Sequence, residues 1–441
     1  MTPRILVVGG GYVGLYAALR LQRTLRSGEA TVTVVDPRSY MTYQPFLPEA
    51  GAGSIQPRHT VVPLRQTLRS TDVVTGWVDR IEHARKVAWV RPLAGEEYEI
   101  PYDVLVMAVG SVPRTLPIPG LADWATGFKN VEEAIRLRNK GLEALDIAEG
   151  ATDPEVRERA LTFVFVGGGF AGVEAMAELE DLLRYATRYL HRVRPSDLRF
   201  VLVEASDRIL PEVGEEMGRW TVEALRERGI EVRLGTRLES TVGGVVQLSD
   251  GTTMLSDTVV WTAGVKASPL ADVLARHLGD GTLTRGGRVV VTPELTVPGH
   301  PEIAVVGDLA ASPDGSGGVL PQLAPVAIQG GRLVAANLVA ELAGHPAEPF
   351  HYVDKGTMAT VGRRNAVAQL PGRLRFSGTP GWLAWLGLHL IMLIGFRNRA
   401  NVMVNWAWNY VTYDRASRLI VGDDDHPARP SGRPMPTDPD R

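Results

Sequence analysis

Apolar and polar positions in the first forty residues follow the order of a strand, a turn, a helix and a second strand. The run Ile5–Val8 is short and wholly apolar, as expected for a parallel strand buried on both faces. Three glycines follow it, and "LYAALRLQRTL" then repeats apolar residues with helical periodicity. The next run, "TVTVVD", is typical of a strand and ends in Asp36. The pattern predicts a β–α–β unit with a glycine-rich turn.

The same pattern recurs in the middle of the chain. "LTFVFV" predicts a buried strand over 161–166, and three glycines and the helical segment "VEAMAELEDLLRYA" follow it. "LRFVLVE" then predicts a strand that ends in Glu204. Two copies of one unit predict an α/β fold with two Rossmann-like dinucleotide-binding domains.

Both turns have GxGxxG spacing, which suits a dinucleotide. One glycine permits the tight turn, one lets the backbone approach a pyrophosphate, and one lets helix and strand pack closely. The free N–H groups of the helix N-terminus favour an anion there. The glycines are Gly9, Gly11 and Gly14 in the first turn, and Gly167, Gly169 and Gly172 in the second.

An acidic residue closes each unit about twenty residues or more after its glycines, where it can hold a ribose diol. Asp36 has this place in the first unit and Glu204 in the second. Glu204 accepts from a free 2′-hydroxyl and repels a 2′-phosphate, so it favours NADH over NADPH. Arg208 lies close by and could soften that preference, although a solvated charge is the simpler interpretation. The economical pairing is FAD in the first unit and a nicotinamide in the second, with hydride passing between them.

An apolar segment near the C-terminus predicts a surface that meets a membrane. Residues 381–396, "GWLAWLGLHLIMLIGF", carry no formal charge, and His389 is their only titratable group. As a helix they would measure about 24 Å, against about 30 Å for a hydrocarbon core. We therefore expect the segment to lie on the membrane. A full crossing, and a buried helix or dimer interface, are the alternatives.

The following segment has a polar stripe at helical spacing, and apolar residues cover its other faces. This favours a helix lying in an interface or docked on protein, although its β-branched and aromatic residues also permit a strand. The stripe consists of Asn398, Asn401, Asn405, Asn409 and Thr412. The aromatic residues expected at the bilayer interface are Trp382, Trp385, Trp406, Trp408, Tyr410 and Tyr413. Arg397 and Arg399 are expected to reach anionic head groups.

Composition narrows the chemistry. The 441 residues suffice for two or three domains, and the net charge of −3 does not indicate nucleic acid as a partner. The absence of cysteine from the sequence excludes disulfides, thiolate metal sites and dithiol redox chemistry. The histidines lack metal-ligand spacing, so we expect no metal. Ile5–Val8 is too short for a signal peptide, which predicts a cytoplasmic start, and residues 423–441 have the composition of a disordered tail.

Beyond the two turns, the chain resembles the two-dinucleotide flavoprotein family. "PEIAVVGDLA" is similar to its strand ending in Gly-Asp, which implies that Asp308 bonds the flavin ribitol. "YDVLVMAVGSVPRTLPIPG" resembles a further signature and implies that Ala108 and Gly110 lie near non-covalently bound FAD. By the same resemblance, the backbone of Val78 would contact the adenine, and Gly264 would contact NADH.

Within that family, members that use cysteine are excluded, and the remaining motifs resemble type II NADH:quinone oxidoreductases. "SYMTYQPFLPEAGAGSIQPRH" is similar to their segment over the flavin ring, with Gln44 and Pro45 close to it. "YVDKGTMATVGRRNAVA" matches their Lys-Gly…Met-Ala-Thr signature, which begins at Lys355. "GWLAWLGLHLIMLIGFRNR" resembles their membrane-facing region. The resemblance extends from about Arg4 to Gly422.

The quinone segment departs from the family pattern. The family usually has Ala-Gln-x-Ala-x-Gln, and this chain has Ala324, Pro325 and Gln329 at the first, second and sixth positions. Ala324 would contact FAD and Gln329 the quinone. Pro325 removes a side-chain amide and a backbone N–H, which puts turnover or quinone preference in doubt.

Glu174, two residues after Gly172, has two interpretations. It is an acid favoured by the helix dipole, or, as the resemblance implies, a carboxylate between the NADH and quinone sites that affects proton movement and quinone access. With Gln329 and Lys355 it completes the implied catalytic set.

We therefore expect an FAD domain at 1–120 and 265–345, an NADH domain at 121–264 and a quinone- and membrane-associating region at 346–422. The charged helical segment "NVEEAIRLRNKGLEALDIAEG" is expected to connect the two domains. The resemblance implies transfer of reducing equivalents from NADH through FAD to a membrane quinone, with menaquinone the expected one. It implies no proton pumping, and a peripheral place on the cytoplasmic face of the cell membrane.

Two alternatives stay open: a soluble NADH-dependent reductase with another acceptor, and a flavin-bound redox sensor. The sequence also leaves a homodimer open.

Overall fold

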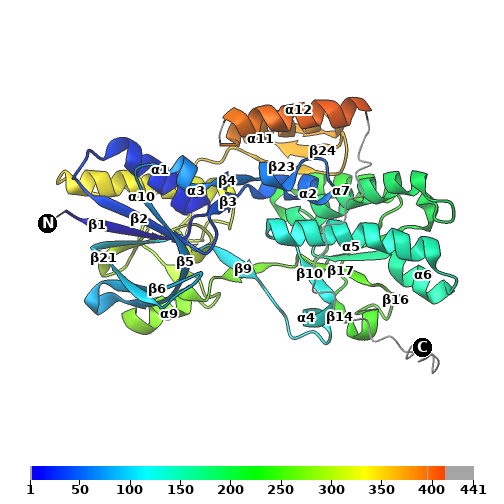
Figure 1. Ribbon diagram of the computed structural model, residues 1–441, viewed down its shortest axis with the longest axis horizontal. Helices are drawn as coiled ribbons and strands as arrows, with labels where there is room; N and C mark the ends of the chain where they lie inside the picture. The colour runs from blue at the N-terminus through cyan, green and yellow to red at the C-terminus, as the bar shows by residue number, and fades with distance from the viewer. Residues whose placement is uncertain (1, 395, 413–441) are drawn as a thin grey trace, which may run out of the picture.

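The computed structural model describes residues 2–394 and 396–412. Two halves lie side by side along the long axis, and a C-terminal layer lies over their junction and the second half (Figure 1). The N-terminus lies at the outer end of the first half.

An eight-stranded sheet forms the first half, in the order β20–β21–β8–β1–β2–β5–β6–β7. Its centre is parallel, because β1 pairs with β2 and β8, and β21 pairs with β8. The chain therefore leaves this sheet and returns to it late, while the domain boundaries set above stay predictions. The strands are β1 (Arg4–Val8), β2 (Thr31–Asp36), β5 (Asp72–Glu82), β6 (Val87–Pro92), β7 (Tyr98–Pro101), β8 (Val104–Met107), β20 (Thr296–Val297) and β21 (His300–Val305).

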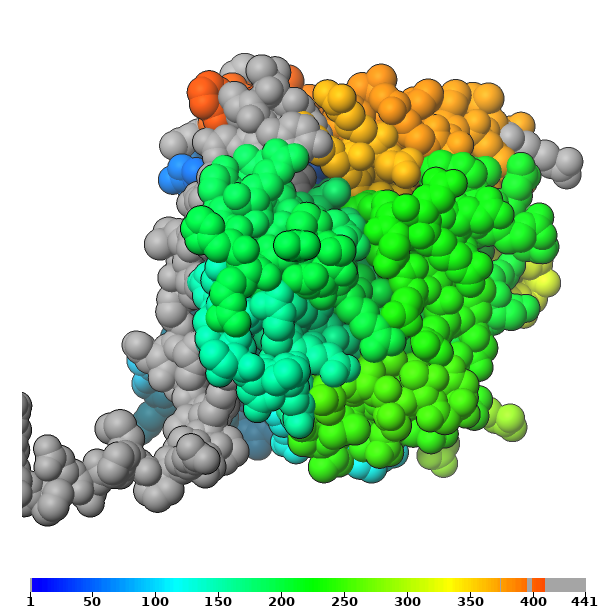
Figure 2. All heavy atoms as spheres, turned by 90° about the vertical axis from the view of Figure 1, so that its right-hand side faces the viewer, coloured from blue at the N-terminus to red at the C-terminus, as the bar shows by residue number. Residues whose placement is uncertain are grey.

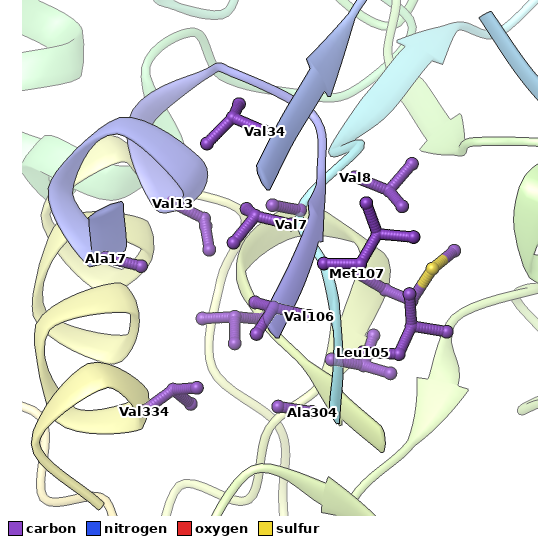
Figure 3. Packing of buried hydrophobic residues seen from close by; sticks show 14 of the residues in the cluster. Val7, Val8, Val13, Ala17, Val34, Leu105, Val106, Met107, Ala304 and Val334 are labelled. Carbon is purple, nitrogen blue, oxygen red and sulfur yellow. The ribbon is translucent and has the colours of Figure 1, made fainter. Parts of the chain in front are cut away.

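Side chains alternate across the central strands, so this sheet is buried on both faces. Val7 and Val106 point toward the helices α1 and α10, whereas Val8 and Met107 point to the opposite side (Figure 3). Each fully buried aliphatic side chain of this kind stabilises the fold by about 1.5–3 kcal/mol. The helices of this half are α1 (Tyr12–Thr24), α3 (Leu64–Thr67), α9 (Leu270–Leu278) and α10 (Ala324–Leu342).

A five-stranded parallel sheet forms the second half, in the order β10–β17–β11–β12–β13. Its strands are β10 (Ala125–Gly127), β11 (Thr162–Val166), β12 (Arg199–Val203), β13 (Glu231–Arg233) and β17 (Thr258–Trp261). A small antiparallel sheet accompanies it, with β14 (Leu238–Ser240), β15 (Val245–Leu248) and β16 (Thr253–Leu255). The helices are α4 (Leu121–Trp124), α5 (Val131–Gly150), α6 (Pro154–Leu161), α7 (Phe170–Ala186) and α8 (Glu215–Glu227).

The segment expected to connect the domains is a helix, but it does not connect them. Asn130 caps α5 in a reciprocal capping box with Glu133, and the apolar face of α5 packs in the core of the second half. The chain passes between the halves at β9 (Ser111–Pro113) and β18 (Val265–Ala267), which pair antiparallel. Periodicity identified the helix but contained no information on what its apolar face would meet. Further short strands and one short α-helix are β3 (Tyr40–Thr42), β4 (Val61–Pro63), β19 (Val289–Val290), β22 (Ala310–Ala311) and α2 (Leu47–Gly51).

The C-terminal layer consists of a three-stranded sheet and two helices. These are β23 (Thr357–Thr360), β24 (Ala366–Gln369), β25 (Arg375–Ser377), α11 (Gly378–Met392) and α12 (Phe396–Thr412). Figure 2 shows this layer, in yellow to orange, along the top of the second half. The strand alternative for the last segment is wrong, because α12 is a helix. Within residues 2–394 and 396–412, no helix is both long and apolar enough to cross a membrane.

The structure corrects which residues of this layer face outward. Trp382, Trp385 and Trp406, expected at a bilayer, are buried in one cluster with Tyr43 and Phe46. These three indoles are therefore packed against protein and do not face a bilayer.

The polar residues of the layer also turn inward. Nδ2 of Asn405 lies 3.1 Å from Nδ1 of the buried His59. Arg399 donates to the carbonyl oxygens of Leu393 and Ile391, each at 2.7 Å, instead of extending outward. Trp408 stays exposed. The side chains of Arg397, Asn398, Asn409, Tyr410 and Thr412, together with Tyr413 and the expected tail at 423–441, lie outside the described residues.

Candidate functional site

The first glycine turn joins β1 to α1. Gly11 precedes α1, and no described side chain caps that helix N-terminus. Of the residues that the structure describes, none has an atom within 4 Å of the place a Cβ would take at Gly11. At Gly14, by contrast, a Cβ would overlap the carbonyl oxygen of Gly9. Gly14 therefore permits the helix to pack on the turn, and Gly11 leaves open space beside an uncapped helix N-terminus, as an anionic pyrophosphate requires.

Asp36 ends β2 beside this turn and holds it in shape. Its Oδ2 accepts the backbone N–H of Gly10 at 2.7 Å, and its Oδ1 accepts that of Arg38 at 2.7 Å. Burial raises the pKa of Asp36, and these two hydrogen bonds act against that rise. Asp36 lines the cavity described next, and its contact with a ribose stays a prediction.

A cavity of about 530 Å³ extends along the carboxyl ends of the first sheet. Eight separate stretches of chain line it, including the turn after β8 and the start of α10. Of the residues expected to contact FAD, it brings together Gly9, Gly11, Asp36, Gln44, Val78, Ala108, Gly110, Asp308 and Ala324. Gly14 and Pro45 are not among the lining residues; Gly14 serves helix packing instead.

A chain of polar contacts on the cavity wall was missed in the sequence. Nζ of Lys129 donates to Oγ of Ser111 at 2.6 Å, and that hydroxyl donates to Oδ2 of Asp308 at 2.6 Å. Burial lowers the pKa of Lys129, whereas the negative charges of Asp308 and Glu133 raise it. Gln322 donates to the backbone carbonyl of Asp308 at 2.9 Å. Lys129 directly precedes the N-cap of α5, and no sequence motif indicates that it faces a cavity of the other half.

The second glycine turn repeats the first. Gly169 precedes α7, again without a side-chain cap among the described residues, and the structure places no described atom within 4 Å of a Cβ built there. At Gly172 a Cβ would overlap the carbonyl oxygen of Gly167. This turn therefore also has free N–H groups and open space for an anion.

Glu204 directly follows β12 and repeats the contacts of Asp36. Its Oε2 accepts the N–H of Gly168 at 2.6 Å, and its Oε1 accepts the N–H of Ser206 at 2.8 Å. Arg208 is exposed, as the simpler interpretation expected. Gly264, in the turn after β17, has a positive φ of 87° and no described atom near a Cβ position. The contacts of Glu204 and Gly264 with NADH stay predictions.

Glu174 is buried at the contact between α7 and the C-terminal layer. Its Oε1 accepts the backbone N–H of Thr360 at 2.9 Å and the Thr360 hydroxyl at 3.3 Å. Burial raises the pKa of Glu174 to about 8, despite these hydrogen bonds and with a further rise from Glu178. The group is therefore largely neutral at pH 7. The helix dipole does not explain why an acidic residue has this position, because Glu174 lies past the first turn of α7 and is buried.

Gln329 and Lys355 do not line the cavity. The side-chain amide of Gln329 donates to the carbonyl of Val353 at 2.9 Å and accepts the N–H of Val353 at 3.1 Å. These two hydrogen bonds of Gln329 therefore join α10 to the segment before Lys355. The side chain of Lys355 is exposed. Their catalytic roles stay predictions.

Pro325 lies in the first turn of α10, where a backbone N–H has no acceptor within the helix. The proline therefore costs no hydrogen bond within the helix at this position. Its effect on the donors near the flavin and the quinone stays a prediction.

Two uncapped glycine turns, each at the carboxyl end of a parallel strand, define an oxidoreductase that binds two dinucleotides. Comparison with known families agrees with this class. Residues 3–331 match the family described as pyridine nucleotide-disulphide oxidoreductase, and residues 355–412 match the NDH2 C-terminal domain.

The relatives specify the group. The type II NADH:quinone oxidoreductase Ndh of Mycobacterium tuberculosis is 36% identical over 429 residues, which cover 95% of this chain and 90% of that one. The Staphylococcus aureus (strain NCTC 8325 / PS 47) type II NADH:quinone oxidoreductase is 31% identical over 378 residues, with 84% and 90% covered. This chain therefore belongs to the type II NADH:quinone oxidoreductases of the pyridine nucleotide-disulphide oxidoreductase family. It is an FAD-dependent enzyme that transfers electrons from NADH to a quinone, as the sequence predicted in preference to its two alternatives.

Solved structures confirm the fold. NDH2 from Plasmodium falciparum in complex with NADH superposes with a TM-score of 0.86 at 16% identity, and covers 96% of this chain and 100% of that one. The sulfide:quinone oxidoreductase of Aquifex aeolicus superposes with a TM-score of 0.70 at 17% identity, with 96% of each chain covered.

Proposed function

We propose that FAD lies in the cavity of the first half and that NADH docks on the second glycine turn. The residues fit the first cofactor, because open space above Gly11 adjoins an uncapped helix N-terminus and a polar wall that includes Asp308. When bound, FAD accepts a hydride from NADH and passes two electrons to a quinone. The residues of the chain bind and orient the two dinucleotides, and the exchange requires no side-chain nucleophile.

Lys129 supplies the one lysine ammonium among the residues lining this cavity, and it is held in place by Ser111. Ser111 links it to Asp308, and all three residues line the cavity. We assign it to flavin binding, where a partly desolvated cation favours negative charge.

Glu174 does not line the cavity, and it is proposed to hold a proton for quinone reduction. A carboxyl group with a pKa of about 8 can release and regain a proton near neutral pH, which quinone reduction consumes. The N–H of Thr360 keeps the carboxyl in one orientation in either state.

The observation that carries the membrane proposal is the outer face of α11 and α12. Ile391 is 69% exposed and Val404 is 68% exposed, and their helices already bury apolar residues on the inner face. The other large apolar residues exposed on these helices are Leu383, Leu388, Met403 and Trp408. A helix pair that is apolar on both faces is suited to docking on lipid, where quinone resides. We place the enzyme as a peripheral protein on the cytoplasmic face of the cell membrane, where the enzyme meets NADH.

Vesicle co-sedimentation tests this docking surface. We expect the flavin-loaded protein to sediment with vesicles of anionic phospholipid, and the double variant Ile391→Asp, Val404→Asp to stay in the supernatant. Val242→Asp is the matched control, because Val242 is 57% exposed in the second half and away from both helices. The proposal fails if the double variant sediments as fully as the control. Soluble NADH oxidation with a water-soluble quinone analogue should be the same in all three, which separates docking from catalysis.

A further inference from the structure

A cluster of two histidines and a glutamate lies at the amino ends of β8 and β21, where the turn after β5 meets them. Nε2 of His83 and Oε1 of Glu302 are 2.8 Å apart, and Nδ1 of His300 lies 3.8 Å from the same carboxylate oxygen. All three candidate ligand atoms lie within 4.8 Å of one another. His83 is 219 residues before Glu302 in the sequence, so only the fold brings the group together. The histidine spacing in the sequence, from which no metal was expected, could not indicate it.

The local structure aims these atoms at one point. His300 and Glu302 are two residues apart on β21, and their side chains therefore project from the same face of the strand. The His83 ring stacks near Tyr102, whose buried hydroxyl lies 3.2 Å from Nδ1 and leaves Nε2 directed at the cluster. A histidine that binds metal through one nitrogen usually has its other nitrogen held in this way.

The spacing and the chemistry suit a divalent transition metal. Ligand atoms around tetrahedral zinc lie about 3.4 Å apart, between the two separations observed. Two imidazole nitrogens and one carboxylate oxygen are a donor set that zinc accepts, with water in the fourth position.

The cluster is distinct from the dinucleotide sites. His300 begins β21, whereas Asp308 follows the carboxyl end of that strand. Likewise, Tyr102 precedes β8, whereas Ala108 follows its carboxyl end. The cluster therefore lies at the amino ends of β8 and β21, whereas the cavity lies at their carboxyl ends.

We propose that His83, His300 and Glu302 bind one zinc-class divalent ion, which fastens the β20–β21 hairpin to the turn after β5. Binding takes neutral imidazoles, with His83 carrying its proton on Nδ1, where the Tyr102 oxygen accepts it. No redox change is involved, and the site serves stability instead of electron transfer.

Competitive titration with zinc alone tests the proposal. Untagged, flavin-loaded protein is treated with a chelator, dialysed into metal-free buffer and titrated in the presence of a chromophoric zinc indicator. We expect one tight equivalent in the wild-type protein, and a loss of affinity of about tenfold or more in Glu302→Gln and in His300→Ala. Flavin content and circular dichroism verify that each variant is folded, and His300→Ala, at a hairpin tip, serves where Glu302→Gln does not fold.

His277→Ala is the matched control, because His277 is exposed on α9 in the same half. It should keep the tight equivalent, and zinc should raise the melting temperature of this control and of the wild type but not of Glu302→Gln. Absence of a tight equivalent in the wild type, or equal zinc affinity in all four proteins, would overturn the proposal.

Discussion

Thr360 donates its backbone N–H to Oε1 of Glu174 at 2.9 Å, and this bond joins β23 to α7 across 186 residues. The contact links the helix of the second glycine turn to the layer that carries the exposed apolar helices. One hydrogen bond therefore connects Glu174, the proposed proton-holding group, to the C-terminal layer that is proposed to dock on lipid.

Replacing Glu174 with Gln should separate the two half-reactions. The amide oxygen of Gln can still accept from Thr360, so the fold is retained, but the side chain can no longer release a proton. We expect flavin reduction by NADH to change by less than about threefold, and reoxidation by quinone to slow by about tenfold or more. Rapid-mixing absorbance at the flavin band measures both steps. Equal losses in the two steps would contradict the proton-holding role.

The same variant should change how stability depends on pH. The pKa of Glu174 is about 8 in the folded protein, against an ordinary value of 4.5. Between these values the folded protein holds a proton that the unfolded chain has lost, so stability falls as pH rises and levels off above about 8. The slope from this group is at most about 1.4 kcal/mol per pH unit.

Melting temperatures measured from pH 5 to pH 9 check this dependence. The wild type should lose more stability than Glu174→Gln between pH 5 and pH 8, and the two should run parallel above. Parallel curves across the whole range would show that Glu174 does not titrate with a raised pKa.

Two glycines of the first turn should respond differently to alanine. Gly11→Ala places a Cβ in open space, so the apoprotein keeps its melting temperature while flavin affinity falls by about tenfold or more, because the methyl group occupies the ligand's side. Gly14→Ala places a Cβ against Gly9 and should destabilise the fold by about 1–3 kcal/mol.

Thermal melts of the apoproteins and fluorimetric flavin titration distinguish the two effects. Gly150→Ala is the control, because its Cβ also meets no described atom and it lies far from the cavity, at the end of α5. Undiminished flavin binding by Gly11→Ala would refute the assignment of this turn.

Lys129→Met should weaken flavin retention. The substitution removes the ammonium that donates to Ser111 and reduces the positive charge near Asp308, where Arg288 remains. Loss of a charged hydrogen bond predicts a decrease in flavin affinity of about 1.5–3 kcal/mol. Equilibrium dialysis measures the flavin affinity. Lys86→Met is the control, because Lys86 lies in the turn after β5, near the amino end of β8 and away from the cavity. Equal affinity in both variants would remove Lys129 from the site.

Local signals were sufficient for much of this fold. Ile5–Val8, Gly14 and Asp36 lie within one short stretch, and the strand, the turn and the acid each constrain the others. The second unit follows from the same signals. Their success reflects short-range physics: apolar runs bury, and glycine permits turns where a Cβ would overlap the backbone.

Long-range relationships could not be obtained in this way. Lys129 and Asp308, or Glu174 and Thr360, meet only after the halves and the C-terminal layer have packed. The inward rotation of Asn405 also depends on a partner, His59, that periodicity cannot identify. A helical wheel shows which residues share a face, but not whether protein or lipid covers that face.

Anaerobic rapid mixing of the purified, flavin-loaded enzyme tests the central claim most directly, namely that the flavin held by the first half relays electrons from NADH to quinone. NADH should bleach the flavin absorbance, and subsequent addition of a menaquinone or a ubiquinone analogue should restore it at a rate no slower than steady-state turnover. A protein that binds no flavin, or a flavin that NADH bleaches and neither quinone restores, would contradict it.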